Sequence, residues 1–411
     1  MAAWNLGFEP SVLAEQIEQT KSVDSIGKAS FSGFAHTEHT SILGSMLCLN
    51  GEIPESEAQK ILNLACFAAA GAGKVTPDAL RCHAEALEKA YLRAPKARFR
   101  LISSISAEFA IEPVTLRIGT TELCFGRRPT RVAEKTHREI VRDSEHSIFG
   151  ELPKFYSPVM ALVSARNPDE AGTQALNQID LIRAIWNLWK NRGQRIRISS
   201  GKRSPVNALI LGPIHTLHTL DGKPATDAWW FEPTYLAPIS LWRETHGRAQ
   251  MLEFTKKVMV LLRKLPYRLA IEAALVRYVR ALDSRDWNST VLQLWSILEV
   301  LTGATLNDSH KVTVRRSAFL FKDFEYAIQV LNHLRCYRNA AVHGGKEGLN
   351  VEAIMYQAKN FVEALLQFHL VRAGQFESLV EVGAFLDLPP RIVEIDRQLA
   401  RLKAVRRYVV R

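Results

Sequence analysis

The sequence predicts a mainly α-helical protein, in which an all-α bundle over residues 251–411 follows a mixed α/β region over residues 1–250. Beyond residue 251, apolar residues recur at helical spacing, and only one proline precedes Pro389. Before residue 251, residues 113–126 alternate apolar and polar side chains, and residues 196–240 are rich in Pro, Gly and Thr. These patterns predict strands and loops in the first region without defining its fold.

The composition is that of a folded protein, with 47% hydrophobic and 23% charged residues among 411. It excludes collagen-like, low-complexity and wholly disordered classes. A net charge of +11 favours polyanionic partners. The five cysteines are an odd number without any Cys-x-x-Cys spacing, which argues against a disulfide framework or a cysteine zinc site and for a reducing compartment.

The amino-terminal residues do not resemble a signal peptide, because they contain Glu9 and Glu15 and lack the early Lys or Arg of such a peptide. The longest apolar run, about residues 61–73, is shorter than the ~20 residues that a membrane span needs. We therefore expect a cytoplasmic protein that does not cross a membrane.

Local signals define several elements of the first region. The Ala- and Leu-rich residues 56–70 predict a helix. Thr76-Pro77-Asp78 predicts the start of the next helix, with a capping hydroxyl, a proline at the first helical position and an acid in the first turn. That helix should end before Pro95. The alternation in 113–126 predicts a β-hairpin, and residues 174–190 return to helical spacing.

Five long helices are expected in the second region. Their approximate ranges are 251–264, 267–283, 285–302, 323–342 and 348–373. Ser284 is a candidate N-cap of the third helix, and Gly303 is its expected C-terminal glycine. Residues 391–411 add an amphipathic basic helix, for which docking against the bundle is the simplest role.

A polar constellation ends the fourth of these helices. Arg338, Asn339 and His343 stand just before Gly344-Gly345, a pair that should stop the helix. Arginine is a permanent cation whose planar donor fork suits phosphate, and histidine exchanges a proton near neutral pH. These residue types can contact a phosphodiester and its 2′-hydroxyl. An Arg and a His at a helix C-terminus are also ordinary surface features, because cations favour that end of the helix dipole.

The pattern Arg-Asn-x-x-x-His, late in a helix of a small bundle, resembles the signature of the HEPN ribonucleases. The sequence from Tyr337 through Gly344 is similar to that of the Apea-like branch of the superfamily. The upstream residues 291–301, with one acid in an apolar run, resemble an earlier helix of the same branch. The resemblance covers about residues 265–375 and does not reach the first 250 residues.

The resemblance implies a HEPN-type bundle and metal-independent cleavage of RNA without a cofactor. It implies that His343 is the general base or acid, that Arg338 stabilises the phosphorane and that Asn339 positions a phosphate or the histidine. Five residues rotate about 140° around an ideal helix, so Arg338 and His343 do not share a face. They converge only if the helix frays at Val342 or if two chains contribute. The family's composite cleft therefore implies a homodimer.

Three neighbours are candidates for supporting roles. Glu299 is the acid within the apolar run and needs a partner, either a structural salt bridge or the side chains of Arg338 and His343, which it would orient. Arg335 lies one helical turn before Arg338, and Tyr337 is adjacent to it. Both are expected to line the cleft or, equally, to serve packing or solubility.

A basic stretch between residues 183 and 203 contains no acid and predicts RNA contacts. Its members are Arg183, Lys190, Arg192, Arg195, Arg197, Lys202 and Arg203. A solvated face is the alternative interpretation of these charges. The interleaved Trp186 and Trp189 fit the apolar stripe of the helix and are assigned to the core.

Other motifs in the chain are incomplete. The residues around Gly73-Lys74 lack the first glycine and the Ser or Thr of a phosphate loop. The pairs His36/His39 and His215/His218 lack further metal ligands. The expectation is thus an endoribonuclease that acts as a toxin or abortive-infection effector in antiviral defence, restrained by an unknown trigger or antitoxin. The alternative is a non-catalytic RNA-binding or dimerisation scaffold.

Overall fold

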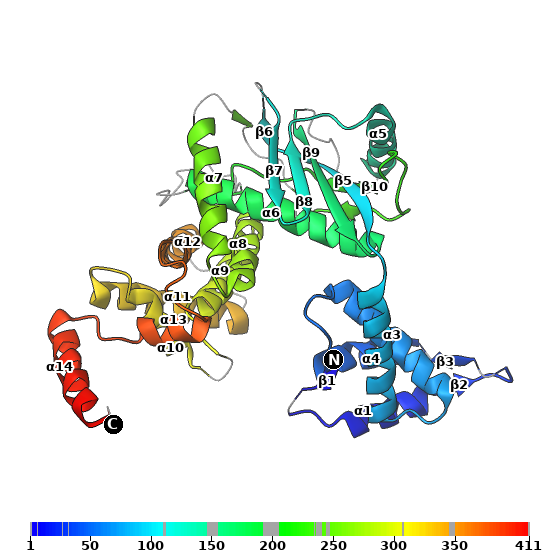
Figure 1. Cartoon of the computed structure of the whole chain (residues 1–411), viewed down its shortest axis with the longest axis horizontal. Coiled ribbons are helices and arrows are strands. Elements are labelled where there is room, and N and C mark those ends of the chain that lie inside the picture. The colour runs from blue at the N-terminus through cyan, green and yellow to red at the C-terminus, as the bar shows by residue number, and fades with distance from the viewer. Residues whose placement is uncertain are drawn as a thin grey trace.

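The computed structural model of the chain is mainly helical, as the sequence predicts (Figure 1). It describes residues 2–5, 7–26, 28–31, 33–109, 112–145, 155–191, 205–233, 235, 241–243, 247–305, 308–344 and 350–409, with the backbone alone at 33, 143–145 and 342–344. Fourteen helices and twelve strands lie within these residues.

A helical unit forms the amino-terminal part, with a core of its own that includes Ile17, Leu43, Cys66 and Leu80. Its helices are α1 (Pro10–Thr20), α2 (Gly33–Met46), α3 (Glu55–Ala72) and α4 (Pro77–Arg93). Two short antiparallel pairs accompany them, β1 (Ala3–Trp4) with β4 (Leu47–Cys48) and β2 (Lys21–Val23) with β3 (Ala29–Phe31). The Thr76 hydroxyl accepts a hydrogen bond from the backbone N–H of Ala79, which confirms the predicted cap.

A six-stranded antiparallel sheet follows, in the order β11-β10-β5-β9-β8-β7. Its strands are β5 (Ala97–Ile105), β7 (Val114–Ile118), β8 (Thr121–Phe125), β9 (Ser157–Ala165), β10 (Ile214–His218) and β11 (Trp230–Phe231). A separate parallel pair joins β6 (Ala107–Glu108) to β12 (Trp242–Arg243). The predicted hairpin is confirmed, because Ile118 pairs with Thr121 across a turn in which Gly119 has φ +56°.

Two helices cover the sheet. The long helix α6 (Pro168–Asn191) crosses one face, onto which alternate residues of β9 such as Val159, Ala161 and Val163 are buried (Figure 1). The shorter α5 (Arg131–Glu145) lies beside β10. Because side chains alternate between the two faces of a strand, the buried apolar residues of β9 all lie on the face that α6 covers.

The remaining helices form the bundle. They are α7 (Arg248–Arg263), α8 (Arg268–Asp283), α9 (Trp287–Leu301), α10 (His310–Ala318), α11 (Phe324–Gly344), α12 (Val351–Val371) and α13 (Leu379–Leu386), followed by α14 (Ile392–Val409). The five expected long helices are present, whereas α10 and α13 were not predicted. Ser284 is not the N-cap of α9. Asp286 is, because its carboxylate accepts from the backbone N–H groups of Asn288 and Ser289.

The larger apolar core extends across residue 250, from Phe99 to Leu386. It joins the sheet, α6 and the bundle, so the gap between the two cores falls between Ala84 and Phe99. Within residues 1–250, the helical unit thus has a separate core, and the sheet shares its core with the bundle. Contacts of this unit with the rest of the chain include an ion pair of Lys60 with Asp169 and the Arg166 guanidinium over the Tyr91 ring.

A buried ion network holds α6 against α8. Arg183, 1% exposed, donates to Asp180 one turn earlier and to both oxygens of Asp283, at 2.6 and 2.8 Å. Arg280 also donates to Asp180, at 2.6 Å. Asn207, which lies between α6 and β10 in the sequence, donates to Asp283 at 2.7 Å. Every strong donor and acceptor of this network therefore has a partner, as a buried charge requires.

A second buried network lies between α6, α8 and α12. The Lys359 ammonium is fully buried, lies 2.8 Å from Glu363 and donates to the carbonyl of Asn191 at 3.0 Å. The Tyr278 hydroxyl donates to the same carboxylate. These contacts fix the C-terminal end of α6 on the bundle.

Removal of the Arg183 guanidinium should destabilise this shared core. In Arg183→Met, Asp283 loses its cationic partner within the protein, so we expect the free energy of unfolding to fall by about 3–5 kcal/mol. Urea titration followed by tryptophan fluorescence reports the change, since Trp186 lies in this core. Lys190→Met, on the exposed side of the same helix, should change it by less than about 0.5 kcal/mol. Equal losses in the two variants would contradict a structural role for Arg183.

The buried imidazole of His369 should make stability depend on pH. Burial lowers the pKa of His369 to about 4 from an ordinary 6.5, while its ring contacts the Leu301 carbonyl at 2.8 Å. Between these values the unfolded chain binds a proton that the folded chain does not, so stability falls as the pH falls. The cost of this group at pH 5 is about 2 kcal/mol.

The matched variant is His369→Gln, whose amide retains a donor for Leu301 and does not titrate. We expect it to be less stable than the wild type at pH 7, but to lose about 2 kcal/mol less between pH 7 and pH 5. His137, whose pKa burial also lowers to about 4, titrates in both proteins and cancels from the comparison. Parallel losses in the two proteins would show that His369 does not titrate as described.

Candidate functional site

The motif predicted from the sequence lies in the last turns of α11. This helix packs against α9, α10 and α12 through an apolar face on which Ala327, Leu331 and Leu334 are buried. This apolar face holds α11 in place, and the polar C-terminal end of the helix extends beyond the buried residues. The segment is thus positioned by packing upstream of the motif.

Arg338 and Asn339 are both half-buried, and the Arg338 guanidinium donates to the Asn339 amide oxygen at 3.3 Å. The side chain of His343 lies outside the described residues. The helix itself continues through Gly344, so fraying at Val342, the first of the two conditions for convergence within the site, is not observed. Positions 338 and 343 therefore lie about 140° apart around one continuous helix.

Two predicted neighbours have contacts that tie α11 to the bundle. The Tyr337 hydroxyl donates to the amide oxygen of Asn288, in the first turn of α9. The Nε atom of Arg335 is buried and has no hydrogen-bond partner among the described residues. Tyr337 thus has a packing role that is visible in the structure, and Arg335 keeps an unsatisfied donor beside the motif.

Glu299 contacts a residue that the sequence did not single out. Its carboxylate accepts from the Trp295 indole at 2.8 Å and lies 2.9 Å from Nδ1 of His310. The contact with His310 ties α9 to α10. Of the two roles expected for Glu299, it corresponds to the structural salt bridge and not to the orientation of Arg338 and His343. His310 lies eleven residues ahead, beyond a turn, and no periodic pattern links it to Glu299.

The basic stretch is only partly described. Arg183 was expected to contact RNA, and this expectation is wrong, because its side chain is 1% exposed and paired with Asp180 and Asp283. Lys190 is exposed near the end of α6, and Trp186 is buried in the core as predicted. Five members lie outside the described residues, namely Arg192, Arg195, Arg197, Lys202 and Arg203.

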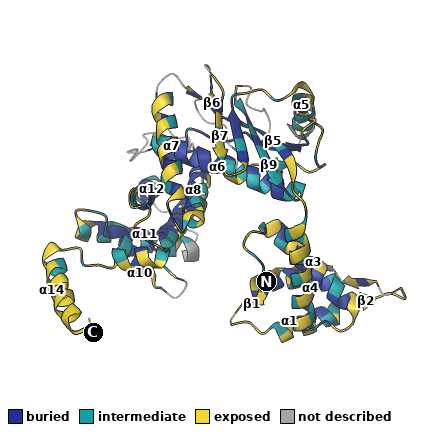
Figure 2. Ribbon diagram, in the orientation of Figure 1, coloured by how far each residue is buried: buried dark blue, intermediate teal, exposed yellow. Residues whose placement is uncertain are grey.

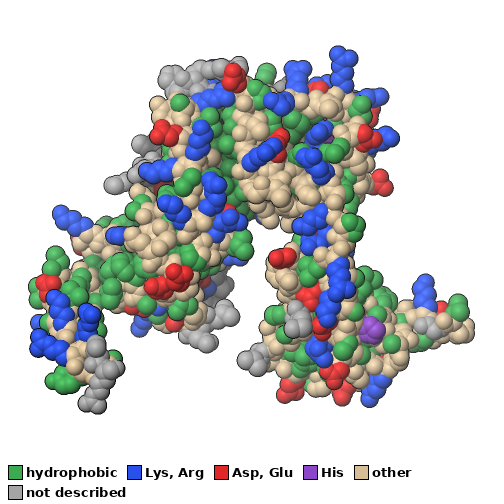
Figure 3. Space-filling view, in the orientation of Figure 1, with side chains coloured by type: hydrophobic (Ala, Val, Ile, Leu, Met, Phe, Trp, Pro, Cys, Tyr) green, Lys and Arg blue, Asp and Glu red, His purple; other side chains and the backbone are tan. Residues whose placement is uncertain are grey.

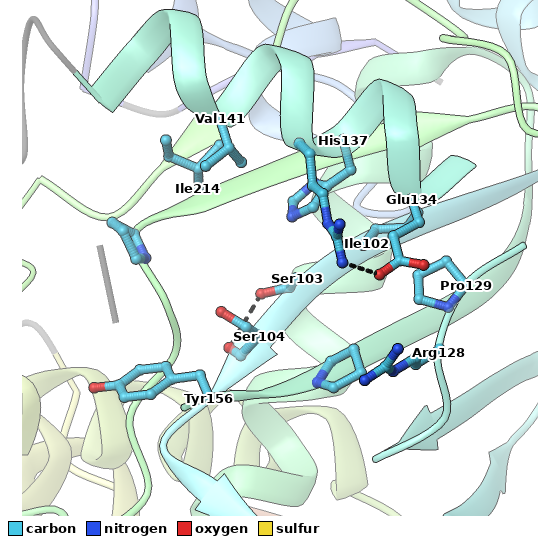
Figure 4. Close-up of a pocket in the computed structure, with 13 residues that line it drawn as sticks. Ile102, Ser103, Ser104, Arg128, Pro129, Glu134, His137, Val141, Tyr156 and Ile214 are labelled. Carbon is cyan, nitrogen blue, oxygen red and sulfur yellow. Dashed lines mark hydrogen bonds and ion pairs between the residues drawn. The ribbon is translucent and has the colours of Figure 1, made fainter. Parts of the chain in front are cut away.

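A cavity of about 360 Å³ lies between α5 and the sheet, away from the motif (Figure 4). Its polar lining comprises Ser103, Ser104, Arg128, Glu134, His137, Arg138 and Tyr156. His137 contacts the Thr216 hydroxyl at 2.7 Å, and burial lowers its pKa to about 4, so the imidazole is neutral at pH 7. Glu134 pairs with Arg138 at 2.5 Å. No sequence motif indicated this cavity.

A hydrogen-bonded chain that begins at Ser103 in the sheet has the composition of a hydrolase triad. Ser103 contacts Nδ1 of His215 at 2.7 Å, and Nε2 of His215 lies 3.2 Å from Glu232. Ser103 also borders the cavity described above, but only 1% of the residue is exposed, so its hydroxyl is closed to a substrate in this structure. His215 and His218 lie three residues apart on one strand and point to opposite faces, which separates the His-x-x-His pair.

Comparisons with protein-family models, curated proteins and solved structures found no match to this chain. Within the described segments, no three His, Cys, Asp or Glu side chains are grouped to hold a metal ion. No helix in those segments has both the length and the apolar character of a membrane span.

Proposed function

We propose that the chain is a metal-independent endoribonuclease with a HEPN-type site formed by Arg338, Asn339 and His343. The observation that carries the proposal is the pattern Arg-Asn-x-x-x-His at the end of a helix in a helical bundle. The contact between Arg338 and Asn339 supports it, because the amide holds the guanidinium beside the end of α11.

The proposed reaction is a transesterification within the RNA backbone. A base removes the proton of a 2′-hydroxyl, the oxygen attacks the adjacent phosphorus, and the bond to the 5′-oxygen breaks after protonation of that oxygen. His343 acts as the general base or acid. Arg338 stabilises the charge that develops on the phosphorane, and Asn339 positions the phosphate or the histidine. The products are a 2′,3′-cyclic phosphate and a 5′-hydroxyl.

A homodimer with a composite site follows from the proposal and the helix geometry. Because α11 remains regular through Gly344, positions 338 and 343 of one chain face different directions. Pairing α11 of two chains brings Arg338 of one copy near His343 of the other. A single phosphodiester can then contact both residue types without distortion of either helix.

The biological role that we propose is that of a toxin or abortive-infection effector against viruses in the cytoplasm. Residues 1–250 would sense a trigger, bind an antitoxin or select RNA, and Lys190 with the five undescribed basic residues would contribute RNA contacts. The separate core of the α1–α4 unit supports a distinct role for that part of the chain.

Cleavage of end-labelled total RNA in EDTA tests the proposal. We expect the wild type to leave 2′,3′-cyclic phosphate ends, and Arg338→Ala and His343→Ala each to lower the rate at least about 100-fold, because general acid–base and charge stabilisation each contribute at this scale. Matched controls are His333→Ala, an exposed histidine of α11, and Arg372→Ala, an exposed arginine after α12. Both controls should cleave like the wild type.

Cellular toxicity separates the ribonuclease from its alternative when no cleavage is seen with purified protein. Toxicity of the wild type that is absent in His343→Ala, with RNA fragments in the cells, indicates a missing trigger in the test tube. A phenotype that His343→Ala leaves intact, without cleavage, contradicts the proposal and favours a non-catalytic RNA-binding or dimerisation scaffold.

A further inference from the structure

Among the residues that the structure describes, no helix or strand packs along the length of α14. None of its 18 residues is buried, and it projects from the bundle beyond α13 (Figures 1 and 2). The ion pair between Arg391 and Glu325, at 3.4 Å, fixes the chain just before the helix begins. The helix is therefore anchored at its start and open to solvent along its length.

One side of α14 carries an apolar stripe. Its members are Ile392, Ile395, Leu399, Leu402 and Val409. The first four follow the spacings of three, four and three residues of a coiled-coil seam, and Val409 comes seven residues after Leu402. Ile392, Leu402 and Val409 are 76%, 65% and 72% exposed. An isolated helix of this length is marginal in water, so such a stripe requires a partner surface.

The charges of α14 are distributed unevenly along it. Both acids, Glu394 and Asp396, lie in the first half, and the second half is basic (Figure 3). Asp396 and Lys403 occupy equivalent positions on the same flank of the stripe, seven residues apart. The helix thus carries opposite charges at matching places on one edge.

We infer that α14 binds α14 of a second copy of this chain as an antiparallel pair. With the twofold axis midway between Leu399 and Leu402, each of these leucines faces the other type in the second copy, and Ile392 faces Val409. Asp396 of each chain then meets Lys403 of the other, which gives two opposite-charge contacts by symmetry. The inference does not depend on the ribonuclease proposal.

The alternative parallel arrangement lacks this complementarity. In a parallel pair, Lys403 of one chain would face Gln398 of the other. Asp396 would face Arg391, which precedes the helix and is already paired with Glu325 in its own chain. The one interruption of the stripe is Arg406, one turn from the helix end, which faces Ile395 in the antiparallel pair. Its aliphatic stem can cover Ile395 while the guanidinium reaches water. The seam is about 27 Å long, so the contact is small and its affinity modest.

Charge reversal in the full-length chain tests the pairing by sedimentation over a wide range of concentration. Asp396→Lys and Lys403→Asp each place like charges opposite one another twice, so each should raise the dimer dissociation constant about tenfold. The double variant, and an equimolar mixture of the two single variants, should restore the wild-type value. Arg397→Asp makes the same change of charge as Lys403→Asp on the far face and should have no effect.

Two outcomes would overturn the inference. The wild type could remain monomeric throughout, or the mixture and the double variant could fail to restore association. A monomeric wild type that binds vesicles of anionic lipid, with binding strengthened in Asp396→Lys and weakened equally in Lys403→Asp and Arg397→Asp, would assign the helix to a membrane surface instead.

Discussion

The guanidinium of Arg183 is the constraint on which the arrangement of sheet and bundle depends. It lies in α6, which covers the sheet and also packs on α8, and its partner Asp283 ends α8. A buried cation without that partner would be prohibitively costly, so α6 and α8 can meet in only one register. The bundle therefore packs on the helix that covers the sheet, and α11 packs in turn on α9, α10 and α12.

Local signals in the sequence were sufficient for much of the fold. The cap at Thr76, the hairpin around Gly119 and the stripes of α11 and α12 depend on residues a few positions apart, and all are present. Apart from the N-cap of α9, which is Asp286 and not Ser284, the errors concern long-range partners. Arg183 looked like part of a basic surface because Asp283 lies 100 residues away. The short helix α10 was missed because its apolar period is brief, and its place depends on contacts of Arg315 and Arg316 with Asp387.

The candidate site shows the same division between local and distant information. Spacing alone gave the angular separation of positions 338 and 343, and the continuous helix leaves that separation in place. Spacing could not show that Glu299 contacts Trp295 and His310, because that choice is made by the turn between α9 and α10. A carboxylate already engaged in this way ties α9 to α10, and any influence on the motif would pass through helix position.

The two proposed contacts between copies make different demands on the chain. An antiparallel α14 pair attaches to its two bundles at opposite ends, about 27 Å apart, so it does not by itself juxtapose the ends of α11. It holds two copies at high effective concentration and leaves the orientation of the bundles to a second contact. A composite site would then form by a step within the pair. Disruption of α14 pairing would make cleavage more dependent on protein concentration, while the rate of the assembled site would stay the same. Concentration dependence and saturating rate therefore separate association through α14 from chemistry at α11.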